Sequence, residues 1–347
     1  MMNYFLMFMS LLCVIIPHTS WTEILKVKTI FQCHPAAGRT FKKIMMPLLE
    51  KNDIQFVDHN EDITLVCGGA GDIQSLQLQS PHIILDEGEN ASIHRPLLRK
   101  AMQNPHLKAV FKNTTLRPKE LYNVSKRYHY EIINQASGQQ KPFPVEIEKI
   151  HTVLWDLHRS AFNKKLNPLA KDDIDYSSPR SVDVFFAGSI LFVGKYFTEK
   201  GQHRTLLLEK LKTIKNYNIV SQKGHLPKDE FINLLKNTKI AISPWGTAEW
   251  CWRDYEAIYC GAVVIKPDTS FVRAVPDLYQ NDTYYVACKA DFSDLEEKIS
   301  YILANYDKFT VMRKNARELL INHWDYEKIA YDFAQAIRQV TTSSVPK

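Results

Sequence analysis

The chain has 347 residues, of which 45% are hydrophobic and 24% are charged. This composition is typical of a globular protein and excludes a disordered or fibrous chain, and the length suits two domains of ordinary size. The net charge of +6 is modest, and Lys and Arg form no run of the kind that nucleic-acid-binding proteins carry. We therefore expect no nucleic acid among the partners, whereas the mild basicity is compatible with a small anionic ligand.

The first residues of the chain form a separate segment. Residues 4–17, YFLMFMSLLCVIIP, are nearly all apolar, and polar HTSWTE follows them. The run is short for a membrane span but suits the core of a signal peptide, although no Lys or Arg precedes it, and a buried strand or helix is the alternative. We predict a signal peptide or short membrane anchor over residues 1–22. Such a segment implies the secretory pathway or a membrane-associated location. Without it, we would expect the chain to be cytoplasmic. Four sequons would accept glycans there: Asn90, Asn113, Asn123 and Asn281.

The cysteines and acidic residues do not form a metal site in the sequence. The six cysteines have no CxxC spacing and no nearby paired histidines, so neither a structural metal nor a disulfide framework is indicated. The sequence DDID, from Asp172 to Asp175, has the form of an Asp-x-Asp metal motif, but no apolar strand leads into it. We interpret it as a solvated acidic turn and predict no metal.

Strand-like and helix-like segments alternate through the first half of the chain. The apolar runs rich in β-branched residues are ILKVKTIFQC (24–33), IQFVDH (54–59), ITLVCGG (63–69), HIILDEG (82–88) and LKAVFKN (107–113). After the first run, HPAAGRT is predicted to turn the chain into an amphipathic helix, FKKIMMPLLEKN (41–52). Strands separated by helical patterns indicate parallel βαβ units. The sequence predicts a Rossmann-like domain over residues 23–165.

A polar stretch with two prolines separates this half from the next, and we predict a linker over residues 166–181. The alternation then restarts with SVDVFFAGS (181–189) and continues through AVVIKPD (262–268). Ser293 and Glu296 have the spacing of a capping box before a helix, and two more helices are predicted near 308–321 and 325–340. The fold class is therefore α/β, with a second Rossmann-like domain over residues 182–347, a cleft between two facing domains, and C-terminal helices.

One strand end of the second half carries an unusual set of side chains. The strand ending at Ser243 opens into PWGTAEWCWRD before a helix, and ligands of parallel sheets bind at such ends. Gly246 lets the backbone approach a ligand, and the helix N-terminus with Arg253 suits a diphosphate. The carboxylates of Glu249 and Glu256 can accept hydrogen bonds from sugar hydroxyls. Three indole rings offer faces for stacking: Trp245, Trp250 and Trp252.

This region resembles a known family. The segment 243–268, SPWGTAEWCWRDYEAIYCGAVVIKPD, resembles the C-terminal half of GT-B glycosyltransferases of the group 1 type, together with DVFFAGS before it and VPDLYQNDTYYVACKADFSDLEEKI after it. It is particularly similar to members that read SPWG…GE…RDYEA…GA…IKPD, and the pattern shades into exostosin-like enzymes. The resemblance covers about residues 182–330. It implies an acceptor domain first, a nucleotide-sugar donor domain second, and a nucleoside diphosphate sugar as co-substrate, with no further cofactor.

The resemblance also implies roles for single residues. Glu256 matches the second glutamate of a paired motif, which binds the ribose hydroxyls. Glu249 matches the first, near the transferred sugar, but six residues separate the two here where the widespread motif has seven, which leaves a catalytic role for Glu249 open. The resemblance also suggests that Gly188 and Ser189, at the end of the domain's first strand, approach the diphosphate. Arg204 and Lys223 are further candidates for phosphate contacts. Of the tryptophans, Trp245 is the one we expect to face the ligand.

The first half offers groups for deprotonating an acceptor. His34 follows the first strand, and Asp86 or Glu87 follows a later one. An inverting enzyme would use one of them as a base, whereas a retaining enzyme would not need it, and the sequence does not decide between the two.

We hypothesise transfer of a sugar from a nucleoside diphosphate donor to a glycan or other hydroxyl acceptor. The alternatives are an epimerase-like GT-B enzyme and a non-catalytic carbohydrate-binding relative. The N-terminal segment also allows an association with membranes.

Overall fold

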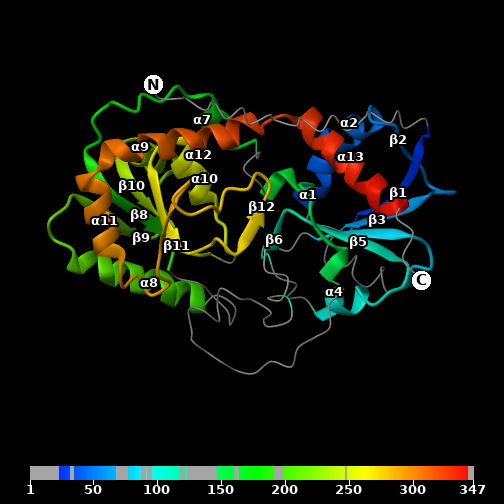
Figure 1. The fold of residues 1–347 in the computed structure, drawn as a ribbon, viewed down its shortest axis with the longest axis horizontal. Coiled ribbons are helices and arrows are strands. Elements are labelled where there is room, and N and C mark those ends of the chain that lie inside the picture. Colours follow the sequence, from blue (N-terminus) through cyan, green and yellow to red (C-terminus); the bar gives the residue numbers. More distant parts are fainter. Residues whose placement is uncertain are drawn as a thin grey trace, which may run out of the picture.

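The chain folds into two α/β units, which Figure 1 shows side by side. This computed structural model describes residues 23–31, 35–67, 77–86, 91, 96–117, 122, 147–159, 164–190, 198–246 and 248–342. The segment 1–22, which carries the predicted signal peptide or anchor, lies outside these residues. Within them, no helix combines the length and apolar character needed to cross a membrane.

The first unit is built on a parallel sheet. In the part of the chain that is described, this sheet has six strands in the order β2-β1-β3-β4-β5-β7. The strands are β1 (Leu25–Phe31), β2 (Ile54–Phe56), β3 (Ile63–Cys67), β4 (His82–Leu85), β5 (Leu107–Lys112) and β7 (Ile150–Thr152). Every residue of β3 and β4 is buried, as expected of central parallel strands covered on both faces. The helices are α1 (Pro35–Thr40), η1 (Phe41–Met45), α2 (Met46–Glu50), α4 (Pro96–Ala101), η2 (Ile147–Lys149) and η3 (Leu157–Arg159).

The first helical segment begins earlier than the sequence suggests. The stretch predicted as a turn is already helical from Pro35, where a missing N–H costs nothing because the first turn has no intrahelical acceptor for it. The π-helical segment η1 and the helix α2 follow, and the helical segment ends at Glu50. The strand β7 was not predicted, because three residues are too few to show a period.

The second unit repeats this plan. Its sheet has five described strands, all parallel, in the order β13-β11-β10-β8-β9. The strands are β8 (Val182–Gly188), β9 (Ile219–Lys223), β10 (Thr238–Ile242), β11 (Val263–Pro267) and β13 (Val286–Cys288). The helices are α7 (Asn167–Lys171), α8 (Thr198–Thr213), α9 (Lys228–Lys236), α10 (Trp252–Tyr259), α11 (Leu295–Ala304), η4 (Tyr306–Phe309) and α12 (Thr310–Asn322). Two parallel sheets with helices agree with the predicted α/β class.

The capping box predicted before α11 is wrong. The N-cap is Asp294, and its side chain makes no capping hydrogen bond. Asp294 Oδ1 instead accepts a hydrogen bond from the backbone N–H of Lys289 at 2.8 Å, while the Ser293 N–H donates to Asp291. The turn before the helix therefore takes up the groups that a capping box would use.

The predicted linker is fixed to the second unit. Arg317 of α12 donates to the carbonyl oxygens of Leu169 and Ala170, and Arg180 donates to Thr238 O at 2.7 Å. In the DDID sequence, Asp175 accepts hydrogen bonds from the hydroxyls of Ser177 and Ser178, as an acidic turn does.

A short antiparallel ribbon joins the two units. It pairs β6 (Thr114–Leu116) of the first unit with β12 (Val272–Ala274) of the second. Next to it, Arg117 Nη2 forms an ion pair with Asp277 Oδ1 at 2.5 Å. The ribbon lies between the two sheets in Figure 1.

The last helix, α13 (Tyr326–Thr342), returns to the first unit, where Figure 1 shows it lying over the first sheet. The ring of Phe333 packs edge-on against Phe41 and Phe111, with 5.8 Å between centroids in each case. Arg338 donates to three backbone oxygens of that unit, those of Glu23, Asn52 and Asp53. The C-terminal helix is thus tied to the first unit.

Candidate functional site

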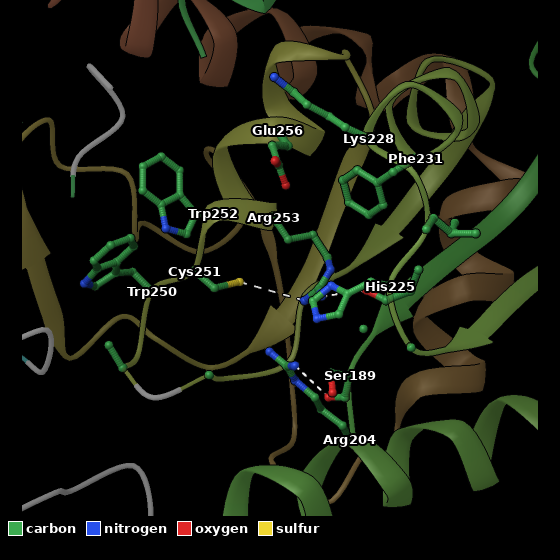
Figure 2. A pocket seen from close by; sticks show the side chains of 16 residues that line it. Ser189, Arg204, His225, Lys228, Phe231, Trp250, Cys251, Trp252, Arg253 and Glu256 are labelled. Atoms are coloured by element: carbon green, nitrogen blue, oxygen red, sulfur yellow. Dashed lines mark hydrogen bonds between the residues drawn. The ribbon is translucent and has the colours of Figure 1, made fainter. Parts of the chain in front are cut away.

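A pocket of about 480 Å³ opens at the carboxyl ends of β8 and β10 (Figure 2). Its size is typical of small-ligand sites, which fall in the range of about 300–1,000 Å³. The wall comes from residues 187–189 at the end of β8, Arg204 of α8, residues 224–226 of the loop after β9, Lys228 and Phe231 of α9, and residues drawn from 246–256. All of these residues belong to the second unit.

Two guanidinium groups meet at Gly188. Arg253 Nη2 donates to Ala187 O at 2.7 Å, and Arg204 Nη1 donates to Ser189 O at 2.9 Å. A Cβ atom at position 188 would lie 2.9 Å from Arg253 Nη2 and 3.5 Å from Arg204 Nη1. Any side chain there would displace the Arg253 guanidinium, so glycine keeps this end of the pocket both open and cationic.

Arg253 is 8% exposed and stacks over the ring of Phe186, with its Cζ 5.0 Å from the ring centroid. Among the described residues, no carboxylate lies within ion-pair distance of this guanidinium, and its buried Nε–H has no hydrogen-bond acceptor. Arg253 also sits in the first turn of α10, where the helix dipole favours negative charge. An anionic ligand at this point would supply the missing counter-charge.

The other end of the pocket combines a carboxylate with apolar groups. Glu256 follows Arg253 by three residues on α10, so both side chains leave the same face of the helix. Burial raises the pKa of Glu256, while the charges of Arg253 and Lys228 act in the opposite direction. Figure 2 shows Glu256 beside Lys228 and Phe231. This end can accept hydrogen bonds from hydroxyl groups and enclose a flat apolar surface.

Most of the predicted donor-binding residues meet in this pocket. Its wall includes Gly188, Ser189, Arg204, Gly246, Arg253 and Glu256. Two others lie elsewhere. Lys223 ends β9 with its side chain exposed, and the wall begins only at the next residue, Gly224. Trp245 is 1% exposed and donates from Nε1 to Thr269 Oγ1 at 2.9 Å, so it supports the loop from within the core.

The two predicted catalytic residues that the structure describes, Glu249 and Asp86, do not line the pocket. Glu249 is fully buried, and its Oε2 accepts a hydrogen bond from the backbone N–H of Ala91 in the first unit at 2.9 Å. Asp86 is buried in an ion pair with Lys112. A general base must be able to take up a proton, whereas this carboxylate is engaged by a buried ammonium group. His34 and Glu87 lie outside the described residues.

Several wall residues carried no signal in the sequence. The loop between β9 and α9 contributes His225 and Leu226, and α9 contributes Lys228 and Phe231. The stretch GHLPKDEF contains no recognisable motif. Its position at the carboxyl end of a strand next to β8 is the one feature from which it could have been found.

The fold and the pocket define an α/β protein with a small-ligand site suited to an anion. Residues 166–335, about half of the chain, match the family model described as "Glycosyl transferase-like", and this part of the chain belongs to that family. No curated protein sequence matches the chain significantly.

The solved structures that resemble the chain include proteins described as glycosyltransferases and one described as a UDP-N-acetylglucosamine 2-epimerase. An α-glucosyltransferase in complex with UDP-glucose and DNA containing an abasic site has 8% identity and a TM-score of 0.46, covering 92% of this chain and 99% of that chain. The Anabaena protein HepE in complex with UDP-glucose has 12% identity and a TM-score of 0.46, covering 90% and 99%. TarM of S. aureus has 13% identity and a TM-score of 0.44, covering 81% and 55%. The family model confirms the predicted family over residues 166–335, and the two parallel sheets confirm the predicted α/β class, while the exostosin-like detail stays a prediction.

Proposed function

We propose that the protein transfers a sugar from a nucleoside diphosphate donor, bound in this pocket, to a hydroxyl group of a glycan or another acceptor. The observation that carries the proposal is the meeting of Arg204 and Arg253 at Gly188, with Glu256 one helical turn further along the same wall. A nucleoside diphosphate has matching parts, a dianionic linkage followed by a ribose with two hydroxyls. The family match of the surrounding segment supports the same reading.

Each part of the pocket then has a role. The two guanidinium groups bind the diphosphate, the Glu256 carboxylate accepts hydrogen bonds from the ribose, and Phe231 forms a wall for the base. During transfer, the bond between the sugar carbon and the diphosphate oxygen breaks and a bond from that carbon to the acceptor oxygen forms. The proton of the acceptor hydroxyl passes to the departing diphosphate, directly or through water. Negative charge grows on the departing diphosphate, where Arg204 and Arg253 stabilise it.

The acceptor is assigned to the side of the first unit. Glu249 supports this assignment, because it follows the pocket residue Ala248 and contacts Ala91 of the first unit. A position of Glu249 near the transferred sugar is part of the proposal. An association with membranes through residues 1–22 is also part of the proposal.

Donor binding is tested by thermal unfolding of the native protein with UDP, GDP, ADP and CMP and with their sugar conjugates. A ligand at one hundred times its dissociation constant adds roughly 2.7 kcal/mol to the free energy of unfolding. Arg253→Leu should abolish this effect. Arg273→Leu, which changes an exposed arginine of β12, should preserve it. If no nucleotide stabilises the native protein, the proposal is wrong.

Turnover is tested by mass spectrometry of the products formed from the stabilising donor and a panel of glycans. A glycosylated acceptor supports transfer. An isomerised sugar nucleotide would indicate an epimerase instead of a transferase. Binding without any product would indicate a carbohydrate-binding relative.

A further inference from the structure

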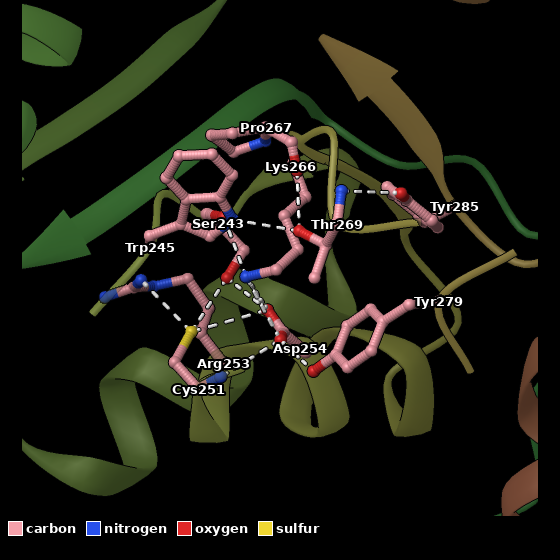
Figure 3. A network of polar contacts seen from close by, with 10 residues as sticks. All are labelled: Ser243, Trp245, Cys251, Arg253, Asp254, Lys266, Pro267, Thr269, Tyr279 and Tyr285. Carbon is pink, nitrogen blue, oxygen red and sulfur yellow. Dashed lines mark hydrogen bonds and ion pairs between the residues drawn. The ribbon is translucent and has the colours of Figure 1, made fainter. Parts of the chain in front are cut away.

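A buried polar network adjoins the pocket (Figure 3), and it shares Cys251 and Arg253 with the pocket wall. Its centre is Asp254 of α10, which is 1% exposed. Asp254 Oδ2 accepts hydrogen bonds from the backbone N–H of Cys251 at 3.0 Å and from the Tyr279 hydroxyl at 2.8 Å, while Oδ1 accepts from the Ser243 hydroxyl. One carboxylate thus holds the end of β10, the start of α10 and the segment after β12.

Lys266 of β11 adds a fourth segment. Its Nζ lies 3.2 Å from Asp254 Oδ2 and 3.4 Å from Ser243 O, and the side chain is 1% exposed. Burying two charges is costly, and an ion pair of this kind often adds little to stability compared with apolar side chains of similar size. Burial also raises the pKa of Tyr279 far above its usual value, so its hydroxyl stays protonated and keeps donating. An arrangement that costs this much and joins four segments calls for a role other than stability.

The network determines the shape of the pocket wall. Ser243 and Cys251 enclose the segment 244–250, from which Gly246, Ala248 and Trp250 reach the wall. Ser243 Oγ lies 2.9 Å from Cys251 Sγ, which closes this loop at its base. Cys251 is also the N-cap of α10, so the same contacts fix the first turn that carries Arg253.

Glu256 depends less on this network. It lies beyond the first turn of α10, where Ala257 and Ile258 are buried in the core and hold the helix independently of its cap. Loss of an N-cap interaction loosens the first turn before the rest of the helix.

We propose that Asp254 and Lys266 form a positioning pair, which holds the Arg253 guanidinium and the 243–251 loop in the geometry that binds the diphosphate of the donor. This inference rests on the proposed function and concerns the same pocket. The pair touches no ligand itself. Its effect is expected on the diphosphate part of the ligand and not on the nucleoside part.

The test compares Asp254→Asn with Asp268→Asn, using the whole chain. Asp268 lies two residues from Lys266 and is exposed. Its Oδ1 accepts hydrogen bonds from Ser270 N and the Tyr285 hydroxyl, and asparagine keeps an acceptor oxygen for both, so it serves as a matched control. Calorimetric titrations use UDP and uridine, or GDP and guanosine if the guanine nucleotide binds better. Asp254→Asn should lower diphosphate affinity by about tenfold or more, because a displaced Arg253 would lose a charged hydrogen bond to the ligand. Nucleoside affinity should change by less than about twofold. Asp268→Asn should change neither.

A second variant covers the case in which Asp254→Asn does not fold. Tyr279→Phe keeps both charges and removes a single donor to Asp254, so it should shift the ratio of diphosphate to nucleoside affinity in the same direction by a smaller factor. Equal losses for both ligands, or an unchanged ratio in a folded variant, would overturn the inference while the proposed function stands. Failure of the native protein to bind either nucleotide would remove both.

Discussion

Replacing Gly188 by alanine should weaken nucleotide binding without weakening the fold. The new Cβ atom would lie 2.9 Å from Arg253 Nη2, too close for a nonbonded contact. The guanidinium is the far end of a flexible side chain, so it will move more readily than the backbone of β8. It then leaves its acceptor, Ala187 O, and turns away from the place where we expect the diphosphate.

The size of the effect follows from what is displaced. A hydrogen bond to a charged group contributes about 1.5–3 kcal/mol, so losing the contact of Arg253 with the diphosphate should lower affinity roughly ten- to a hundredfold. The φ angle of Gly188 is not in the left-handed region, and alanine there reduces the entropy of the unfolded chain. That gain of about 0.4–1 kcal/mol offsets part of the lost bond to Ala187, so the net change in stability should stay within about 1 kcal/mol.

The assay measures nucleotide affinity by titration and stability by urea unfolding. The comparison variant is Gly261→Ala, for which stability and not affinity should fall. Gly261 has a φ of +71°, and a Cβ there would lie 2.9 Å from Ile174 Cγ2, away from the pocket. This variant should lose about 1 kcal/mol or more of stability and keep its affinity. If Gly188→Ala bound nucleotide as the native protein does, the assignment of Arg253 to the diphosphate would be refuted.

Three further predictions concern other parts of the molecule. Burial raises the pKa of Glu256, so its carboxylate takes up a proton at a higher pH than an ordinary glutamate does, and nucleotide affinity should begin to fall at that higher pH as the solution is acidified. The free energy of unfolding should change in the opposite sense and decrease as the pH rises through that pKa. Glu256→Gln should flatten both dependences in titrations and unfolding curves recorded across the acidic range. Glu249→Ala should lower turnover more than donor binding, and Glu249→Gln, which keeps an acceptor for the Ala91 N–H, should restore turnover only if that contact is what matters; unchanged turnover in both variants would contradict a role for this residue. Arg338→Met should lower the free energy of unfolding by about 3 kcal/mol and leave nucleotide affinity unchanged, because three backbone oxygens lose a charged donor far from the pocket.

The parallel sheets could be predicted because their strands are buried on both faces. Runs such as ITLVC and HIIL are apolar or β-branched at nearly every position, which distinguishes them from the helices between them. The ribbon of β6 and β12 could not be predicted. Each of its strands has three residues, and each is stabilised by a partner that is remote in the sequence.

In the pocket, predictability follows the regularity of the backbone. Arg253 and Glu256 stand three residues apart on a helix, so their shared face follows from the sequence spacing alone. Trp245 lies in an irregular loop, where no period tells which side chains face the ligand and which face the core. Lys223 and Gly224 are adjacent at a strand end, and the chain turns into the pocket only at the second of them.

Thr269 connects the β6–β12 ribbon that joins the two units with the loop that lines the pocket. It accepts the indole N–H of Trp245, which supports the floor of the pocket, and its carbonyl oxygen accepts a hydrogen bond from Val272, the first residue of β12. The ribbon between the units and the pocket loop are therefore linked through residues 269–272. Because β12 is paired with β6 of the first unit, we expect a rotation of that unit to change the shape of the pocket.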